Sequence, residues 1–266
     1  MSKFIDRLNQ ISRVAPQPIG FRAGASVSAK PKMLLVASLA GADVDQLAER
    51  VAGADAGLIA IAKASLAAKT FTRVTQAAPK IIWGGWLKDI AVKDVAPMAK
   101  AGGDFVVFPA ATTPISIAQN KELGKVLEVE ASLGEGLLRA AGELPVDAVL
   151  INGGKKDSLT WHHLMLFQRF AELLVKPLLV SVPAEVTAEE LPSLWEAGVD
   201  GVVIEVGVGQ AVDRIKNLRE IIDKLTFPPQ RKRKKAEALL PHVVPVAEAG
   251  AEEEEEGDEE ESDRLG

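Results

Sequence analysis

Two glutamates near the middle of the chain have a spacing that suits acid/base chemistry. Glu128 and Glu130 alternate with apolar residues in the run 126–132, and residues two apart in a β-strand lie on one face. A carboxylate on a buried face must be paired or protonated, so Glu130 needs a partner, for which Lys63 or Glu205 is a candidate. A Lys–Glu pair in a cleft can transfer protons, although a purely structural salt bridge produces the same pattern.

Small residues late in the chain have the character of an anion site. Ser181 ends one apolar run, and Gly207 and Gly209 follow the next run. Glycines let backbone amides approach a phosphate, and the N-terminus of a following helix adds its dipole. The alternative to phosphate binding is that these glycines only form a tight turn and bind no ligand. Glu205 stands directly before this loop and would repel a phosphate unless it is neutralised.

A third candidate follows another apolar run. Asn152 is followed by Gly153 and Gly154 and then by two lysines, which resembles an anion nest with added positive charge. Asn152 would orient a substrate there. A surface loop with solvated lysines explains the same residues equally well.

Two tryptophans flank a pair of glycines in Trp83-Gly84-Gly85-Trp86. Trp83 could stack on a planar ring such as a flavin or a base. The competing interpretation is that these aromatics pack against helices around a bulge. No metal site is predicted, because Cys is absent and the adjacent His162 and His163 would point in different directions on a helix.

These residues lie at the ends of eight short apolar runs, each followed by a helical stretch. Most of the runs are continuous rather than alternating, as expected for parallel strands buried on both faces. The runs are 33–39, 57–62, 80–86, 104–109, 126–132, 147–152, 177–183 and 200–207. The helices are expected to begin near Asp43, Ser65, Asp89, Thr113, Gly134, Ser158, Thr187 and Gly209. Thr187 and Glu190 have the spacing of a capping box.

An alternating mark precedes the runs. Even-numbered runs follow an Asp and odd-numbered runs follow a Lys: Asp55, Asp104, Asp147 and Asp200 against Lys32, Lys80, Lys125 and Lys176. A strand–helix–strand–helix unit repeated four times closes naturally into a ring. The pattern therefore predicts a (β/α)8 TIM barrel rather than an open doubly wound sheet. The marks fall on the N-terminal rim of such a barrel, where structural roles are expected.

The segment Ala197-Gly198-Val199-Asp200-Gly201-Val202-Val203-Ile204, with the glycines behind it, resembles the phosphate-binding TIM barrels, including the ribulose-phosphate-binding and flavin-binding groups. The resemblance implies a phosphate group at the loops after strands seven and eight. The loop after strand seven, 182–185, departs from it because the usual Gly-Gly-Ile element is missing.

Charge divides the chain into two parts. The net charge is −6, yet residues 248–266 hold eleven acidic residues and one Arg, and the basic run Arg231–Lys235 precedes them. Residues 1–227 are predicted to form the barrel, with an N-terminal helix over 2–14 across one end. Residues 228–266 form a basic and then acidic low-complexity tail that is predicted to be largely disordered.

The chain has no Cys, no apolar run of the roughly 18 residues that a membrane helix needs, and no signal-like N-terminus. It is therefore expected to be soluble and cytoplasmic, without a membrane partner. The acidic block would compete with nucleic acid for the basic run, which disfavours a nucleic-acid partner, whereas a protein partner could bind the tail.

The sequence leads to two functional hypotheses. In the first, the barrel binds a phosphorylated small molecule or a flavin at its C-terminal face and could be an enzyme of unassigned reaction. The cofactor is unknown, with FMN as one candidate. In the second, the barrel is a non-catalytic pseudoenzyme that acts as a binding or scaffold protein through its charged tail. The few polar residues at the strand ends favour this second hypothesis.

Overall fold

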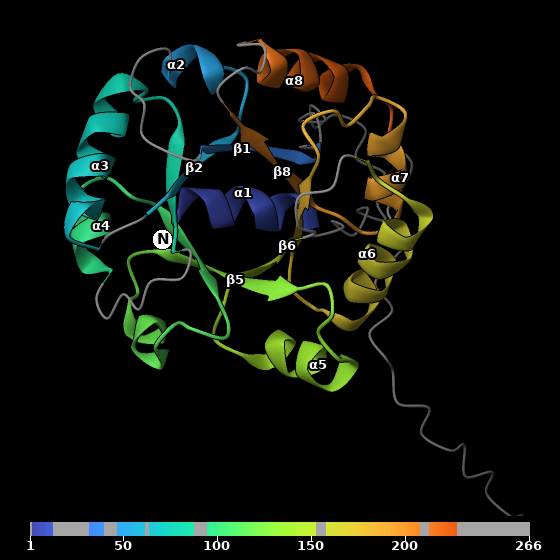
Figure 1. The fold of residues 1–266 in the computed structure, drawn as a ribbon, viewed down its shortest axis with the longest axis horizontal. Coiled ribbons are helices and arrows are strands. Elements are labelled where there is room, and N and C mark those ends of the chain that lie inside the picture. The colour runs from blue at the N-terminus through green and yellow to red at the C-terminus, as the bar shows by residue number, and fades with distance from the viewer. Residues whose placement is uncertain are drawn as a thin grey trace, which may run out of the picture. The chain divides into compact units, whose positions relative to one another are not determined.

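The computed structural model describes residues 2–12, 32–39, 47–61, 64–87, 95–152, 158–207 and 213–227. They contain eight parallel strands that pair in chain order, and the last pairs with the first (Figure 1). The strands are Leu34–Leu39 (β1), Ala56–Ala60 (β2), Ile82–Trp86 (β3), Phe105–Pro109 (β4), Gly124–Glu130 (β5), Ala148–Asn152 (β6), Leu178–Val182 (β7) and Gly201–Val206 (β8). The predicted closed barrel is confirmed. The predicted tail, 228–266, lies outside the described residues.

Helices surround the ring of strands (Figure 1). They are Leu47–Arg50 (α2), Ala64–Ala77 (α3), Ala96–Lys100 (α4), Glu135–Glu143 (α5), Trp161–Leu173 (α6), Glu190–Glu196 (α7) and Arg214–Lys224 (α8). The α-helix predicted from Thr113 is wrong, because the segment after β4 forms the short 3-10 helix Ile115–Gln119 (η1). Pro114 holds an extended backbone before η1, so a longer helix cannot begin at Thr113.

Alternation along the strands produces two apolar layers. Leu35, Val149 and Val202 face the surrounding helices in the outer layer. Val36 and Leu150 face the barrel interior. Because both faces of each strand are buried, the runs read as continuously apolar in the sequence.

The N-terminal helix Lys3–Ser12 (α1) closes one end of the interior, as predicted. Its apolar face is buried in the inner layer, and the ring of Phe4 stacks on Phe105 of β4 with centroids 4.1 Å apart. Ser2 caps the helix, since its Oγ accepts the N–H of Ile5 at 3.3 Å. Asp104 holds the same helix start, because its carboxylate accepts the Phe4 N–H at 3.0 Å and the Ser2 hydroxyl at 2.6 Å.

The other Asp marks join neighbouring strands at the N-terminal rim. Each of these three carboxylates accepts the N–H of a residue at the start of the preceding strand. Asp55 binds Leu35 at 2.9 Å, Asp147 binds Lys125 at 2.7 Å, and Asp200 binds Leu178 at 2.7 Å. Their predicted structural role is confirmed. The repeat that marks the strands in the sequence is therefore a repeated hydrogen bond between consecutive strands.

Three of the four Lys marks satisfy carbonyl groups on the same rim. The Nζ of Lys32 donates to Leu225 O at 2.9 Å, that of Lys125 to Asn120 O at 2.9 Å, and that of Lys176 to Val146 O at 2.7 Å. These bonds tie the strand starts to segments that end nearby. These three lysines thus have the structural role that their spacing indicates.

Asp55 provides a test of these rim contacts by pH. Burial raises the pKa of its carboxyl, although Arg219 Nη1 lies only 3.0 Å from Asp55 Oδ2 and the Leu35 N–H also lowers that pKa. The folded chain therefore holds this proton to a higher pH than the unfolded chain, whose Asp pKa is about 3.9. The resulting stability is present below the unfolded pKa and is lost as the pH rises through the folded pKa.

We expect Asp55→Asn to remove this contribution to the pH dependence. Urea unfolding measured across the acidic range should show a smaller fall in the free energy of unfolding with rising pH than the unchanged chain shows. Asp6→Asn, at an exposed position of α1, is the control and should keep the original slope. An Asp55→Asn slope equal to that of the control would contradict the assignment.

Candidate functional site

The mouth at the C-terminal ends of the strands carries the polar residues of the barrel interior. The inner layer contains Val36, Val107, Val126, Leu150, Leu179 and Val203. Two residues beyond them, on the same strand faces, are Ser38, Pro109, Glu128, Asn152, Ser181 and Glu205. The apolar interior thus changes to a polar ring at the level where the βα loops begin, which is where TIM barrels place their ligands.

Glu128 is the centre of a hydrogen-bonded group in this ring. Its Oε2 accepts the indole N–H of Trp86 at 2.5 Å, and its Oε1 accepts Nδ2 of Asn152 at 2.8 Å. The three side chains come from β5, β3 and β6, so the bonds cross the mouth. Trp86 is 3% exposed and Glu128 is half-buried. Both donors are neutral, and Glu128 has no ion pair with another residue of the described ranges.

Glu130, the predicted acid/base residue, ends β5 on the same strand face as Glu128. It is exposed, and its Oε2 accepts the Ser132 hydroxyl at 3.1 Å. Its predicted partner Lys63 lies outside the described residues, and no ion pair joins Glu130 to another residue within the described ranges. The Glu130–Lys63 pair remains a prediction.

Sequence reasoning named Glu128 together with Glu130 but gave the acid/base role to Glu130 and assigned no partner to Glu128. It shares the alternation that drew attention to Glu130 but sits one step deeper. The available signal was Trp86, since a buried indole N–H needs an acceptor. A glutamate deep in the mouth could have supplied it.

Trp83 lies on the other side of the sheet. It is 1% exposed in the outer layer, and its Nε1 donates to Ala78 O at 3.1 Å beside α3. The geometry does not support stacking of Trp83 on a ligand. The predicted bulge is also wrong, because β3 pairs with β2 residue by residue from Ile82 to Trp86.

The glycines of β3 have a different purpose. A Cβ on Gly84 would lie 2.3 Å from the ring of Phe105, so Gly84 makes room for an aromatic side chain of the next strand. The Phe105 ring therefore fills the space beside Gly84.

The ends of β7 and β8 retain open space. Ser181 is half-buried on the inward face, and a Cβ on Gly207 would meet nothing within 4 Å. Arg50 Nη1 donates to Gly207 O at 2.7 Å, which fixes the backbone at that point. Gly209 lies outside the described residues, as do Gly153 and Gly154.

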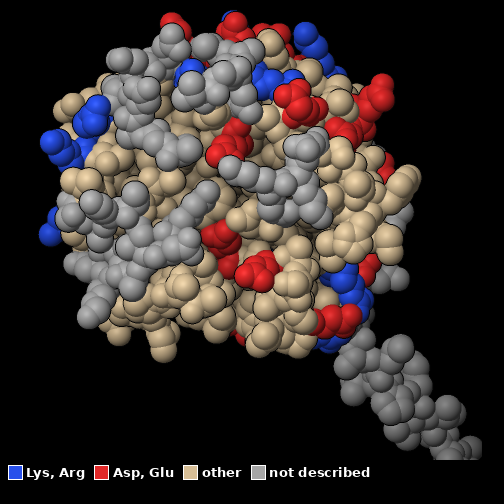
Figure 2. Space-filling view, viewed as in Figure 1, with Lys and Arg blue, Asp and Glu red and all other residues tan. Residues whose placement is uncertain are grey.

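The described part of the mouth is acidic. Glu128, Glu130 and Glu205 lie on the inward faces of β5 and β8, and Figure 2 shows acidic side chains near the middle of the face in view, with basic ones toward its edge. Across the described ranges, no three His, Asp or Glu are grouped to hold a metal ion. No helix in those ranges is both long and apolar enough to cross a membrane.

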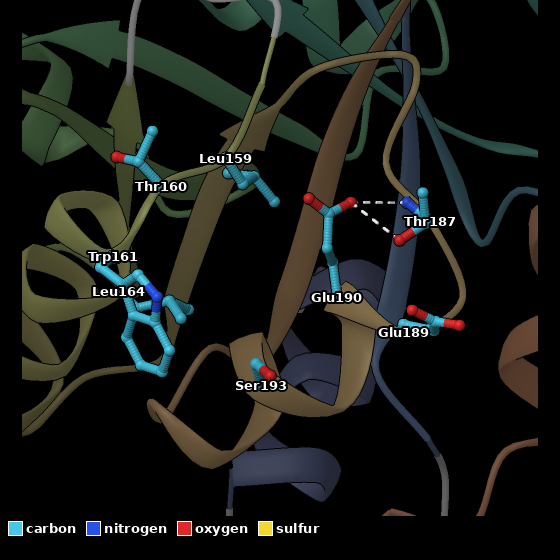
Figure 3. A pocket seen from close by; sticks show the side chains of 8 residues that line it. All are labelled: Leu159, Thr160, Trp161, Leu164, Thr187, Glu189, Glu190 and Ser193. Carbon is cyan, nitrogen blue, oxygen red and sulfur yellow. Dashed lines mark hydrogen bonds between the residues drawn. The ribbon is translucent and has the colours of Figure 1, made fainter.

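A hollow of about 380 Å³ lies outside the strands between α6 and α7 (Figure 3). Several of its polar side chains bond to residues of the same helix starts. The N–H and hydroxyl of Thr187 both donate to Glu190 Oε2, at 2.7 and 3.0 Å, so the Glu190 half of the predicted capping box is present. The Glu190 N–H bonds to Thr187 O at 3.3 Å rather than to the Thr187 hydroxyl, so the other half is not formed. Thr160 and His163 form a similar box at the start of α6. The hollow therefore lies between the capped N-terminal ends of α6 and α7, and we assign no ligand to it.

No protein-family model matches the chain, and no curated protein matches it. Solved structures do. A thiamine phosphate pyrophosphorylase from Pyrococcus furiosus is 14% identical with a TM-score of 0.57, over 72% of this chain and 96% of that one. A tryptophan synthase alpha-subunit from P. furiosus is 13% identical with a TM-score of 0.56, over 73% and 97%. The resemblance to TIM barrels is thus confirmed for the fold.

Proposed function

We propose that this protein binds a phosphorylated small molecule at the mouth of the barrel, with the phosphate at the ends of β7 and β8. The observation that carries the proposal is the open space at Gly207, just after β8, at the same end of the barrel as the inward-facing Ser181 of the neighbouring strand β7. Backbone amides and a hydroxyl in such a recess are suitable phosphate donors. The name of the thiamine phosphate pyrophosphorylase, a structural neighbour, indicates a phosphate ester as well.

A flavin fits this site less well than a phosphate ester without a large ring. FMN would need a surface for its ring, and Trp83, the residue predicted for that role, is buried in the outer layer. A compact phosphate ester has no such requirement, because it needs only the hydroxyl of Ser181 and the recess at Gly207. We therefore place a compact phosphate ester ahead of FMN.

The second candidate function is a non-catalytic barrel, and the Glu128 group favours it. The half-buried carboxylate accepts hydrogen bonds from Trp86 and Asn152, so Glu128 is held in place by protein donors, as a structural or binding group would be. Trp86 also fills part of the mouth. Binding without turnover needs only the recess at β7 and β8, so we assign no reaction.

Phosphate binding can be tested with a charge placed in the recess. Gly207→Asp should fold normally, because a side chain there meets open space. It should weaken the binding of glycerol 3-phosphate about tenfold or more, since like charges repel. Ser181→Ala removes one hydrogen bond and should weaken binding about three- to tenfold. Calorimetric titration of the full chain measures both effects.

Gly142→Asp is the matched control. Gly142 lies near the C-terminal end of α5, away from the βα loops of the mouth, and a Cβ there would meet only Val175 N at 4.0 Å. It adds the same charge and should leave the affinity unchanged. Equal affinities for glycerol 3-phosphate in all four proteins would overturn the proposed site.

A further inference from the structure

We propose that the ligand also carries a protonated amine, held by the glutamates of β5 and β8 together with Ser38. This inference rests on the proposed function in one respect, namely that a ligand occupies the mouth. It adds the chemical class of the ligand, which is a phosphate ester that carries an amine rather than one without an amine.

The first observation is a buried serine whose hydroxyl faces the mouth. Ser38 is 5% exposed, and it lies on the inward face of β1 two residues after Val36 of the inner layer. Within the described ranges no other side chain is seen to bond to its hydroxyl. The Ser38 oxygen is not among the fully enclosed polar atoms that lack a partner, so it keeps some accessible surface and has capacity to bond to a ligand.

Glu205 stands beside that hydroxyl. Ser38 and Glu205 are partners in the β1–β8 register and share the inward face, so their side chains are neighbours. Glu205 has no ion pair within the described part of the chain. A donor placed between them could give one hydrogen bond to the carboxylate and one to the Ser38 oxygen.

Glu128 supplies negative charge from the other side. Its two hydrogen bonds come from uncharged donors, and each carboxylate oxygen retains capacity for a second bond. An eight-stranded barrel is only wide enough for side chains or one small ligand, so β5 and β8 face the same narrow space. A cation there would be attracted by both glutamates.

An ammonium group matches this arrangement better than a metal ion does. It has three donors that can reach separate acceptors on different strands. A metal ion needs several oxygens grouped at short range, and the described residues contain no such group. The polar ring spreads single acceptors over β1, β5 and β8.

Two probes that differ in the amine separate this inference from the proposed function. Phosphoethanolamine and glycerol 3-phosphate both carry a phosphate ester, but only the first carries an ammonium group. At about 0.15 M salt, where long-range attraction to the acidic tail is screened, the full chain should bind phosphoethanolamine about tenfold more tightly. Ethylamine, as a third probe, reports on the amine site without a phosphate.

Glu205→Gln should abolish the preference, and it should not disturb folding because Glu205 is exposed. Ser38→Ala should reduce the preference about threefold or more. Glu143→Gln, at an exposed position of α5, is the matched control and should keep it.

The outcomes are distinct. Equal binding of both esters would overturn the amine inference and leave the phosphate proposal standing. Ethylamine binding that depends on Glu205, without binding of glycerol 3-phosphate, would support the amine site and overturn the phosphate site. Binding of none of the three probes would overturn both.

Discussion

Asp200→Ala is expected to lower the free energy of unfolding by about 2–4 kcal/mol. The carboxylate is fully buried, and its Oδ2 accepts the N–H of Leu178 at 2.7 Å, which ties the start of β7 to the start of β8. Alanine would leave that amide buried without an acceptor and would create a small void. Urea denaturation should show a lower midpoint with an unchanged slope, as expected for a loss of stability alone.

Asp147→Ala is the matched control for this effect. Asp147 makes the equivalent bond to the N–H of Lys125 at 2.7 Å, but it is only half-buried. Water can replace part of the lost bond there, so we expect a loss of about 1 kcal/mol. Asp200→Asn should lie between the two, because an amide oxygen can still accept. Equal losses for both Ala variants would show that burial does not set the cost.

The barrel was predictable because its rim repeats. Where an even strand begins, the first amides of the preceding strand need a hydrogen-bond acceptor. The carboxylates of Asp55, Asp147 and Asp200 supply it, so this local requirement produces a periodic pattern in the sequence. Asp104 keeps the mark but serves α1 instead.

The candidate site was less predictable because its contacts are long-range. Alternation indicated the correct face of β5, yet it could not show which glutamate meets a donor. That choice depends on Trp86, which is 42 residues away in the sequence. Several other predicted site residues lie outside the described ranges, so Lys63, Gly153, Gly154 and Gly209 remain predictions.

The packing role of Gly84 was not predicted, for a related reason. Two glycines between tryptophans suggest an open backbone, but a missing side chain can equally be filled by a neighbour. Here Phe105 of the next strand takes the space. Sequence pattern shows where the Cβ is absent and does not show what occupies its place.

Gly84→Ala is therefore expected to destabilise the fold by about 2–3 kcal/mol, which is large for the addition of one methyl group. The new Cβ would lie 2.3 Å from the Phe105 ring. That ring cannot easily yield, because Phe4 of α1 stacks on it with centroids 4.1 Å apart and both residues are buried. The strain should reach α1, and protease cleavage near the N-terminus should become faster.

Two further variants show whether the collision with Phe105 causes the loss. Gly85→Ala makes the same change one residue on, where the nearest atom of Phe71 is 3.2 Å away, so its cost should be smaller. Phe105→Leu opens space beside Gly84, and the double variant Gly84→Ala with Phe105→Leu should lose less stability than the sum of the single variants. Strict additivity in this double-mutant cycle would mean that the two side chains do not compete for the same space.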